Sequence, residues 1–210
     1  MIRVLIADDH DVIREGVKRI LEDTPDIRVS DEARDGQELV QKASRGAPDV
    51  VLLDLSMPGR GGLEALKDLR AERPKLPILV LSMHEEDQYA VRVIRAGASG
   101  YLTKARVSEC LVDAIRKVIG GGKYLTPTVA DLLAQDVAQD SGRPRHEKLS
   151  DREFQVFSLL ASGKTVSEIA EHLALSVQTI STYRAHILEK LGLLNTAQII
   201  RYAHQHQLAS

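Results

Sequence analysis

The sequence predicts an α/β fold, a doubly wound five-stranded parallel sheet, followed by a small all-α domain of four helices. In the first part, short apolar runs alternate with amphipathic stretches. The runs are continuously apolar, as strands buried on both faces are. From Leu149 onward the strand pattern is absent, and helix-capping signals indicate helices only. A chain of 210 residues is long enough for two such domains.

Five apolar runs are the predicted strands, and helical patterns lie between them. In the first helix we assign Val12, Val17, Ile20 and Leu21 to the stripe that faces the core. A strand–helix unit repeated five times is typical of a parallel sheet with helices on both faces. The predicted strands are residues 2–7, 27–30, 50–53, 78–81 and 100–102.

The pattern changes after the glycines at 120–122, where the first domain is expected to end. Residues 126–138 are expected to form a short amphipathic helix. Residues 139–148 are polar and lack periodicity, as linkers do. We therefore predict a first domain at 1–122, a linker with a short helix at 123–148, and a helical domain at 149–210.

Capping signals divide the second domain into four short helices. Two of them are capping boxes, and Gly163 and Gly192 stand where C-terminal caps are expected. The second and third helices are joined by a tight turn at 174–176, which predicts a helix-turn-helix over about 166–185. The capping residues are Ser150 with Glu153, Thr165 with Glu168, Ser176, and Asn195 with Gln198.

The residues just beyond the predicted strands carry the chemistry of the first domain, because ligands of open α/β sheets bind at the carboxyl ends of the strands. Three crowded carboxylates repel one another, and Mg²⁺ relieves that repulsion. A carboxylate there can act as a nucleophile and form an aspartyl phosphate, which a lysine and a hydroxyl can stabilise. These residues are Asp8 and Asp9, then Asp54, Ser82, Thr103 and Lys104.

Each of these residues alone also has an ordinary structural interpretation. Asp8 and Asp9 could cap a helix, and Asp54 could be a turn acid. Ser82 could be another cap, and Lys104 a solvated charge. Their joint occurrence at successive strand ends favours a site for phosphoryl transfer.

Residues 1–120 resemble the receiver domain of two-component response regulators. The resemblance implies that Asp54 accepts a phosphoryl group. It implies Mg²⁺ bound by Asp9, Asp54 and the Ser56 backbone carbonyl, with Asp8 assisting through water. The motifs that carry it are Ala7-Asp8-Asp9-His10, Leu53-Asp54-Leu55-Ser56-Met57-Pro58-Gly59, Leu81-Ser82-Met83-His84 and Tyr101-Leu102-Thr103-Lys104.

The same resemblance implies a switch pair, Ser82 and Tyr101. Ser82 would move toward the phosphorylated Asp54, and Tyr101 would turn inward. The alternative for Tyr101 is a half-buried aromatic residue with no switching role.

Two residues depart from the receiver pattern. Many receivers have proline after the lysine, often across a cis bond, where this chain has Ala105; a cis bond before a residue other than proline is unfavourable. Met83 stands where many receivers have a small residue. We hypothesise that Met83 restricts the approach of water and prolongs the life of the phosphorylated state.

The third helix of the second domain, about 177–191, would present its outer face to the major groove of DNA. Gln178 can read adenine, and Arg184 can pair with a phosphate. The core stripe would be Ile180, Tyr183, Ile187 and Leu191. The predicted DNA-binding residues are Gln178, Thr179, Ser181, Thr182, Arg184 and Ala185.

Charge does not distinguish DNA binding from protein binding. Residues 149–210 carry five basic and five acidic residues, so the basic surface typical of DNA-binding domains is missing. A small helical bundle that binds another protein is the alternative.

The helical domain resembles the LuxR-type DNA-binding domain, and the whole chain is similar to NarL/FixJ-type response regulators. Many relatives have lysine on the outer face of the recognition helix where this chain has Ser181 and Ala185. The fourth helix, 195–206, commonly dimerises in that family. The motifs are Leu149-Ser150-Asp151-Arg152-Glu153, Ala161-Ser162-Gly163-Lys164, Glu168-Ile169-Ala170, Leu173, Ser176, Thr179-Ile180 and Lys190-Leu191-Gly192.

The resemblance implies a phosphorylation-dependent transcription regulator with Mg²⁺ as cofactor. Its partners would be a sensor histidine kinase, double-stranded promoter DNA and, when phosphorylated, a second copy of the chain. One alternative is an enzyme that hydrolyses phosphate esters, although no Walker loop or Gly-x-Ser-x-Gly motif supports it. Another is a regulator that no longer uses phosphate.

Composition is consistent with a cytoplasmic protein. The single cysteine, Cys110, cannot form an intramolecular disulfide. No basic and apolar leader pattern follows Met1, and no apolar run has the length of a membrane span. The net charge of -2 predicts no partner.

Overall fold

The computed structural model describes residues 1–58, 61–83, 88–138, 144–206 and 208. Gly59 and His84 of the receiver motifs lie outside the described residues. The chain divides into two compact units, Met1–Ala130 and Asp131–Ser210. The division falls within the segment predicted as the linker, and the domain limits given above stay predictions.

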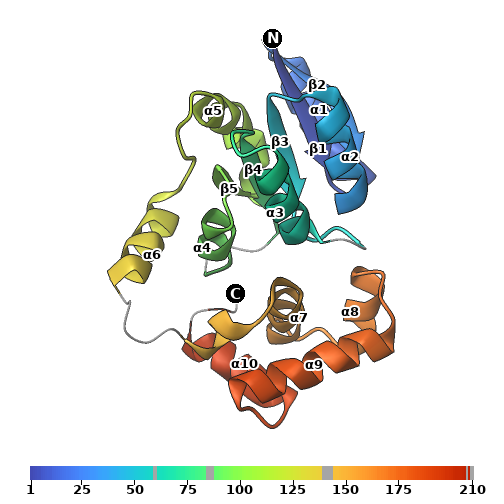
Figure 1. The fold of residues 1–210 in the computed structure, drawn as a ribbon, viewed down its shortest axis with the longest axis vertical. Coiled ribbons are helices and arrows are strands. Elements are labelled where there is room, and N and C mark those ends of the chain that lie inside the picture. Colours follow the sequence, from blue (N-terminus) through green and yellow to red (C-terminus); the bar gives the residue numbers. More distant parts are fainter. Residues whose placement is uncertain (59–60, 84–87, 139–143, 207, 209–210) are drawn as a thin grey trace. The chain divides into compact units, whose positions relative to one another are not determined.

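The first unit is built on a five-stranded parallel sheet in the order β2-β1-β3-β4-β5 (Figure 1). This confirms the predicted fold class. The strand order reverses between β1 and β3, and ligands of such sheets bind at the carboxyl ends of the strands beside that reversal. The strands are β1 (Ile2–Ala7), β2 (Ile27–Ala33), β3 (Val50–Asp54), β4 (Ile78–Ser82) and β5 (Gly100–Thr103).

Helices cover both faces of the sheet, which explains why the strands are continuously apolar. Helices α1 (Asp11–Glu22) and α5 (Val107–Ile119) share one hydrophobic core with alternate strand residues such as Val4, Ile6 and Leu52. Helices α2 (Gly36–Gly46) and α3 (Gly62–Glu72) lie beside each other against the sheet, and α4 (Gln88–Arg95) contacts β5. The buried strands place their carboxyl ends side by side.

The inner face of α1 differs from the predicted stripe. Val12 is 82% exposed, so its assignment to the core was wrong. Arg14 lies on the buried face with Val17 and Leu21, at helical spacing from both. The helix therefore buries a charged side chain at a position where periodicity alone would place an apolar one.

The segment after α5 covers the outer edge of β5. Tyr124 forms a parallel bridge with Gly100, and the Tyr101 amide donates to the Tyr124 carbonyl at 3.2 Å. A Cβ atom at Gly100 would lie 2.7 Å from that carbonyl oxygen, so the close approach requires glycine. An edge strand that is covered in this way is protected from pairing with other chains. Helix α6 (Pro127–Ala138) follows and matches the helix predicted at 126–138.

The second unit contains the four predicted helices and a short 3₁₀ turn, η2 (Arg145–Lys148). Both capping boxes are present, and Ser176 and Asn195 cap the last two helices as expected. Gly163 and Gly192 have φ angles of 85° and 68°, which glycine adopts without strain. The helices are α7 (Asp151–Ala161), α8 (Val166–His172), α9 (Val177–Leu191) and α10 (Thr196–Gln205).

Candidate functional site

The acidic residues and the lysine predicted from the strand ends lie together. The Lys104 ammonium lies 2.7 Å from Asp8 Oδ2 and 2.9 Å from Asp54 Oδ2. These three residues follow or end β1, β3 and β5, which lie far apart in the sequence. All three side chains are at most 4% exposed, so their charges face one another rather than water.

Burial has a clear electrostatic effect on this group. Burial raises the pKa of the Asp54 carboxyl above its usual range, and the nearby Asp8 carboxylate adds to the rise, while Lys104 opposes it. For Lys104, burial would lower the pKa, but Asp54 and Asp8 more than offset this, and the pKa is raised. Lys104 therefore stays charged and is the main group that opposes the rise in the Asp54 pKa.

Asp9 and His10 complete the cluster at the end of β1. Asp8, Asp9, His10 and Asp54 each offer a ligand atom, and these atoms all lie within 4.8 Å of one another. The His10 ring nitrogen lies 2.9 Å from Asp9 Oδ1 and 3.2 Å from Asp8 Oδ1. His10 was missing from the predicted site, although the Ala7-Asp8-Asp9-His10 motif contains it.

The donor set fits a hard divalent cation. Three carboxylates within reach of one another supply the oxygen ligands that Mg²⁺ prefers. Asp9 Oδ1 and Asp54 Oδ2 are buried and receive no hydrogen bond of normal geometry among the described residues; their near neighbours are the His10 ring nitrogen and the Lys104 ammonium. Carboxylate oxygens in that state have coordination capacity left for a cation.

The remaining predicted residues of the first domain lie around this cluster. The Ser56 amide donates to Asp54 Oδ1 at 3.1 Å, so the loop after β3 orients the carboxylate. Ser82 ends β4 and is fully buried. Tyr101, on β5, is also fully buried, and its switch role stays a prediction.

A cavity of about 700 Å³ lies beside the cluster, lined by Ile13, Met83, Lys104 and Thr128 among others. Met83 lies at the edge of this cavity and is 74% exposed, so the role given to it above stays a hypothesis. Ala105 lies in the 3₁₀ turn η1 (Lys104–Arg106), and the described residues contain no cis peptide bond. The Lys104 ammonium thus reaches Asp8 and Asp54 although Ala105 replaces the proline found in many receivers.

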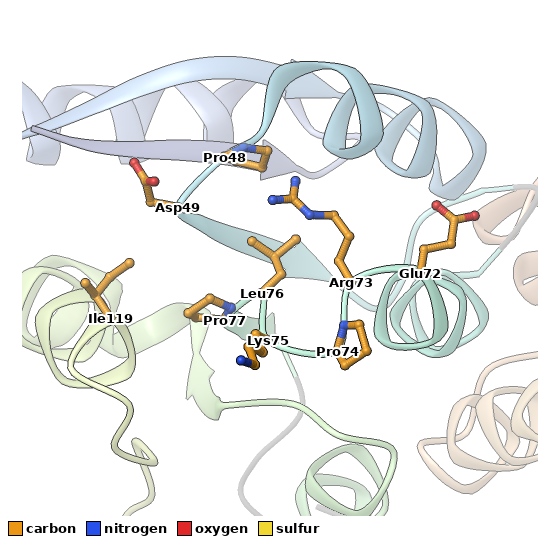
Figure 2. A pocket seen from close by; sticks show the side chains of 9 residues that line it. All are labelled: Pro48, Asp49, Glu72, Arg73, Pro74, Lys75, Leu76, Pro77 and Ile119. Atoms are coloured by element: carbon orange, nitrogen blue, oxygen red, sulfur yellow. The ribbon is translucent and has the colours of Figure 1, made fainter.

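A second cavity, of about 670 Å³, lies before β3 and β4, at the opposite end of these strands (Figure 2). Three of its charged side chains, Asp49, Glu72 and Arg73, already have partners. Asp49 accepts hydrogen bonds from Arg3, and Arg73 Nη1 donates to the Ala43 carbonyl at 2.7 Å. Glu72 accepts from Ser44 at 3.0 Å. The carboxyl end of the sheet is therefore the better candidate for a site.

The predicted DNA-binding residues lie on α9, and their exposure differs. Gln178, Thr182 and Ala185 are exposed, whereas Thr179, Ser181 and Arg184 are half-buried. Arg184 Nε donates to Thr196 Oγ1 at 2.8 Å, so this side chain is also tied to α10. Of the predicted core stripe, Ile180, Ile187 and Leu191 are buried and Tyr183 is half-buried. The buried stripe leaves one polar face of α9 open.

Comparison with known families and proteins agrees with this architecture. Residues 4–116 match the family model described as the response regulator receiver domain. Residues 147–203 match the model for bacterial regulatory proteins of the luxR family. The chain belongs to the response regulators: it combines a receiver domain with a LuxR-type DNA-binding domain, in a family of two-component transcription regulators rather than typical enzymes.

Curated relatives are similar over the whole chain. Response regulator GacA of Pseudomonas aeruginosa is 38% identical over 207 residues, which cover 98% of this chain and 97% of that protein. Response regulator UvrY of Escherichia coli is 36% identical over 211 residues, with 100% and 97% covered. The similarity therefore extends over both units.

Solved structures show the same two-part architecture. RcsB of Salmonella enterica serovar Typhimurium, bound to promoter rprA in the presence of phosphomimetic BeF₃⁻, is 28% identical with a TM-score of 0.64. The match covers 96% of this chain and 97% of that chain. Response regulator ChrA of a heme-sensing two-component system is 35% identical with a TM-score of 0.52, with 99% and 98% covered. Among the described residues of this protein, no helix is long and apolar enough to span a membrane.

Proposed function

We propose that Asp54 accepts a phosphoryl group from a sensor histidine kinase and that this controls promoter binding by the helical unit. One observation carries the proposal: a buried ammonium, Lys104, lies within 3 Å of both Asp8 and Asp54 at the carboxyl end of the sheet. The same lysine would pair with the oxygens of a phosphoryl group on Asp54.

In the transfer step, a carboxylate oxygen of Asp54 attacks the phosphorus of a phosphohistidine. A new O–P bond forms, the N–P bond of the donor breaks, and its electron pair returns to the imidazole nitrogen. Lys104 neutralises charge on the phosphoryl oxygens, and the Ser82 hydroxyl donates a hydrogen bond to one of them. The receiver would thus catalyse only its own phosphorylation and dephosphorylation.

Asp9, Asp54 and the Ser56 carbonyl would hold Mg²⁺, with Asp8 assisting through water. When bound, the cation neutralises the crowded carboxylates and the incoming phosphoryl group. The buried oxygens of Asp9 and Asp54 support this assignment.

Phosphorylation would act on the helical unit through Ser82 and Tyr101. Tyr101 lies beside the segment that leads toward the second unit, because its amide is bonded to the Tyr124 carbonyl. A displacement of β5 at Tyr101 would therefore act first on Tyr124, in the segment that leads to α6.

The DNA partner would be bound by α9, through Gln178, Thr179, Ser181, Thr182, Arg184 and Ala185. Support comes from RcsB, whose structures include two dimers bound to two parallel DNAs, at 29% identity and a TM-score of 0.61. We propose that this chain also binds DNA as a homodimer when phosphorylated. A regulator of promoters would act in the cytoplasm.

Labelling with acetyl phosphate tests the proposal. The wild-type chain is expected to take up about one phosphoryl group in the presence of Mg²⁺, in a bond that hydroxylamine cleaves, and Asp54→Asn is expected to take up none. Asp49→Asn, at the opposite end of β3, is the matched control and should label like the wild type. Equal labelling of Asp54→Asn and the wild type would contradict the proposal, and repeated release of phosphate would favour an enzyme.

A further inference from the structure

We infer that Arg14 is a positioning residue of the acidic site: its guanidinium holds the Asp8 backbone carbonyl and so sets the orientation of the Asp8 and Asp9 carboxylates. The inference rests on the proposed function, because it takes this site to be the one that binds Mg²⁺. No motif in the sequence singled out Arg14, and it touches neither Lys104 nor Asp54 in any contact described above.

Arg14 is 4% exposed and uses its guanidinium in three directions. Nη1 donates to the Asp8 carbonyl at 2.7 Å in a buried hydrogen bond. Nε donates to Glu32 Oε2 on β2 at 2.9 Å, and Nη2 pairs with Asp11 at the start of α1. The planar guanidinium group is therefore fixed between the end of β1, strand β2 and the first turn of α1.

The bond to the Asp8 carbonyl matters because a peptide unit is planar. The carbonyl that Arg14 holds belongs to the peptide that joins Asp8 to Asp9. Because that peptide is planar, holding its carbonyl also determines the position of the Asp9 backbone nitrogen and Cα atom. The Asp8 amide donates to the Ala33 carbonyl at 3.1 Å, which holds the other side of the residue. With both backbone groups held, Asp8 keeps Oδ2 at 2.7 Å from Lys104.

An apolar residue would satisfy the packing of α1 at this position. Arg14 shares the buried face with Val17 and Leu21, and the burial of a guanidinium carries a desolvation cost that an apolar side chain would avoid. The structure offsets this cost with Glu32 and Asp11. What arginine supplies here, and an apolar residue could not, is a hydrogen bond to the carbonyl of the peptide between Asp8 and Asp9.

Lys18 provides an internal comparison on the same helix. Its ammonium lies 2.8 Å from Glu32 Oε1 and also pairs with Glu15. Lys18 therefore shares the Glu32 carboxylate with Arg14, but no bond to the Asp8 backbone is among these contacts. If Arg14 positions Asp8 and Asp9, its loss should affect the acidic site and the loss of Lys18 should not. If Arg14 only forms ion pairs, the two losses should have similar effects.

The test is a Mg²⁺ titration of the full chain by calorimetry, for the wild type, Arg14→Met, Arg14→Lys and Lys18→Met. Arg14→Met is expected to weaken Mg²⁺ binding about tenfold or more, as loss of groups that orient metal ligands does. Arg14→Lys should weaken it a few-fold, because a single ammonium cannot keep the forked contacts to both Asp8 and Glu32. Lys18→Met should bind like the wild type.

Circular dichroism and thermal unfolding establish that each variant is folded, and if Arg14→Met does not fold, Arg14→Lys decides the question. Wild-type affinity in the folded Arg14 variant would overturn the inference, and so would an equal loss in Lys18→Met. A wild-type chain that binds no Mg²⁺ would instead contradict the proposed function itself. The two failures are therefore distinguishable.

Discussion

The two units use their functional residues in opposite ways. In the first unit, charged side chains from three strand ends are buried, and the Lys104 ammonium lies within 3 Å of both the Asp8 and the Asp54 carboxylate. In the second unit, the residues expected to read DNA lie along one helix, with Gln178, Thr182 and Ala185 exposed. Buried charges interact strongly with one another, so the kind of ligand they can bind follows from the residues of the cluster. Exposed polar groups lack such interactions, and what they recognise depends on the partner molecule.

The largest effect is expected for Lys104→Met. This change leaves Asp8 and Asp54 buried without their cation, and removing one partner of a buried ion pair typically costs about 3–5 kcal/mol. We expect a loss of about 3 kcal/mol in the free energy of unfolding of the first unit at neutral pH, measured by urea denaturation. Because Mg²⁺ would replace part of the lost charge, its addition should raise the stability of the variant more than that of the wild type.

Lys190→Met is the matched control in the second unit. Lys190 pairs with Glu153 at 2.6 Å; Glu153 is 5% exposed, but Lys190 is 40% exposed, so water screens its charge and its loss should cost about 1 kcal/mol or less. A cost for Lys190→Met as large as that for Lys104→Met would break the contrast between the units.

Gln178→Ala is expected to have the next largest effect, on DNA recognition only. If Gln178 reads a base edge, its loss should reduce discrimination between the operator and variants of it by about 1–3 kcal/mol. The measurement is binding of phosphorylated protein to an operator obtained by selection from random DNA, and to operators with single changes. Glu171→Ala, an exposed change on α8, should leave that discrimination intact.

Glu153→Ala tests a buried contact within the helical unit. It removes half of the capping box at α7, and a helix cap contributes about 1 kcal/mol. Burial raises the pKa of the Glu153 carboxyl, but hydrogen bonds from Lys190 and Ser150 more than offset this, and the pKa is lowered.

A carboxyl with a lowered pKa stabilises the fold above its unfolded pKa of about 4.3 and loses that contribution as the pH falls through its folded pKa. The stability difference between the wild type and Glu153→Ala should therefore be full at pH 7 and should shrink below about pH 4. Thermal unfolding of residues 144–210 across this pH range measures it. A difference that grows in acid would contradict the assignment.

Met83→Ala is expected to have the smallest effect. Opening the cavity beside Lys104 should admit water and shorten the life of phosphorylated Asp54 a few-fold, which corresponds to less than about 1 kcal/mol in the barrier. The measurement is the decay of labelled protein after removal of acetyl phosphate. Equal decay in both proteins would refute the role given to Met83.

Sequence alone predicted the sheet, its helices and the convergence of Asp8, Asp54 and Lys104. This was possible because the carboxyl ends of parallel strands must meet at one edge, so strand position determines proximity. The capping boxes were equally predictable, because they depend on residues only three positions apart.

Other features could not be predicted, because they depend on contacts that periodicity does not encode. Arg14 occupies an apolar position of α1, and only the folded chain brings the Asp8 carbonyl and Glu32 to it. Val12 has the right residue type for the core but lies on the exposed side. The pairing of Tyr124 with the edge of β5 is likewise a contact across more than 20 residues, with no local signal.

A crystal structure of the chain with Mg²⁺ and beryllium fluoride tests the central claim most directly. We predict that the beryllium atom of a BeF₃⁻ group is bound to an Asp54 carboxylate oxygen, that Lys104 and Ser82 contact its fluorine atoms, and that Asp9 and Asp54 hold the cation. A structure in which Asp54 stays unmodified at saturating beryllium fluoride, with the cation bound elsewhere, would contradict the account.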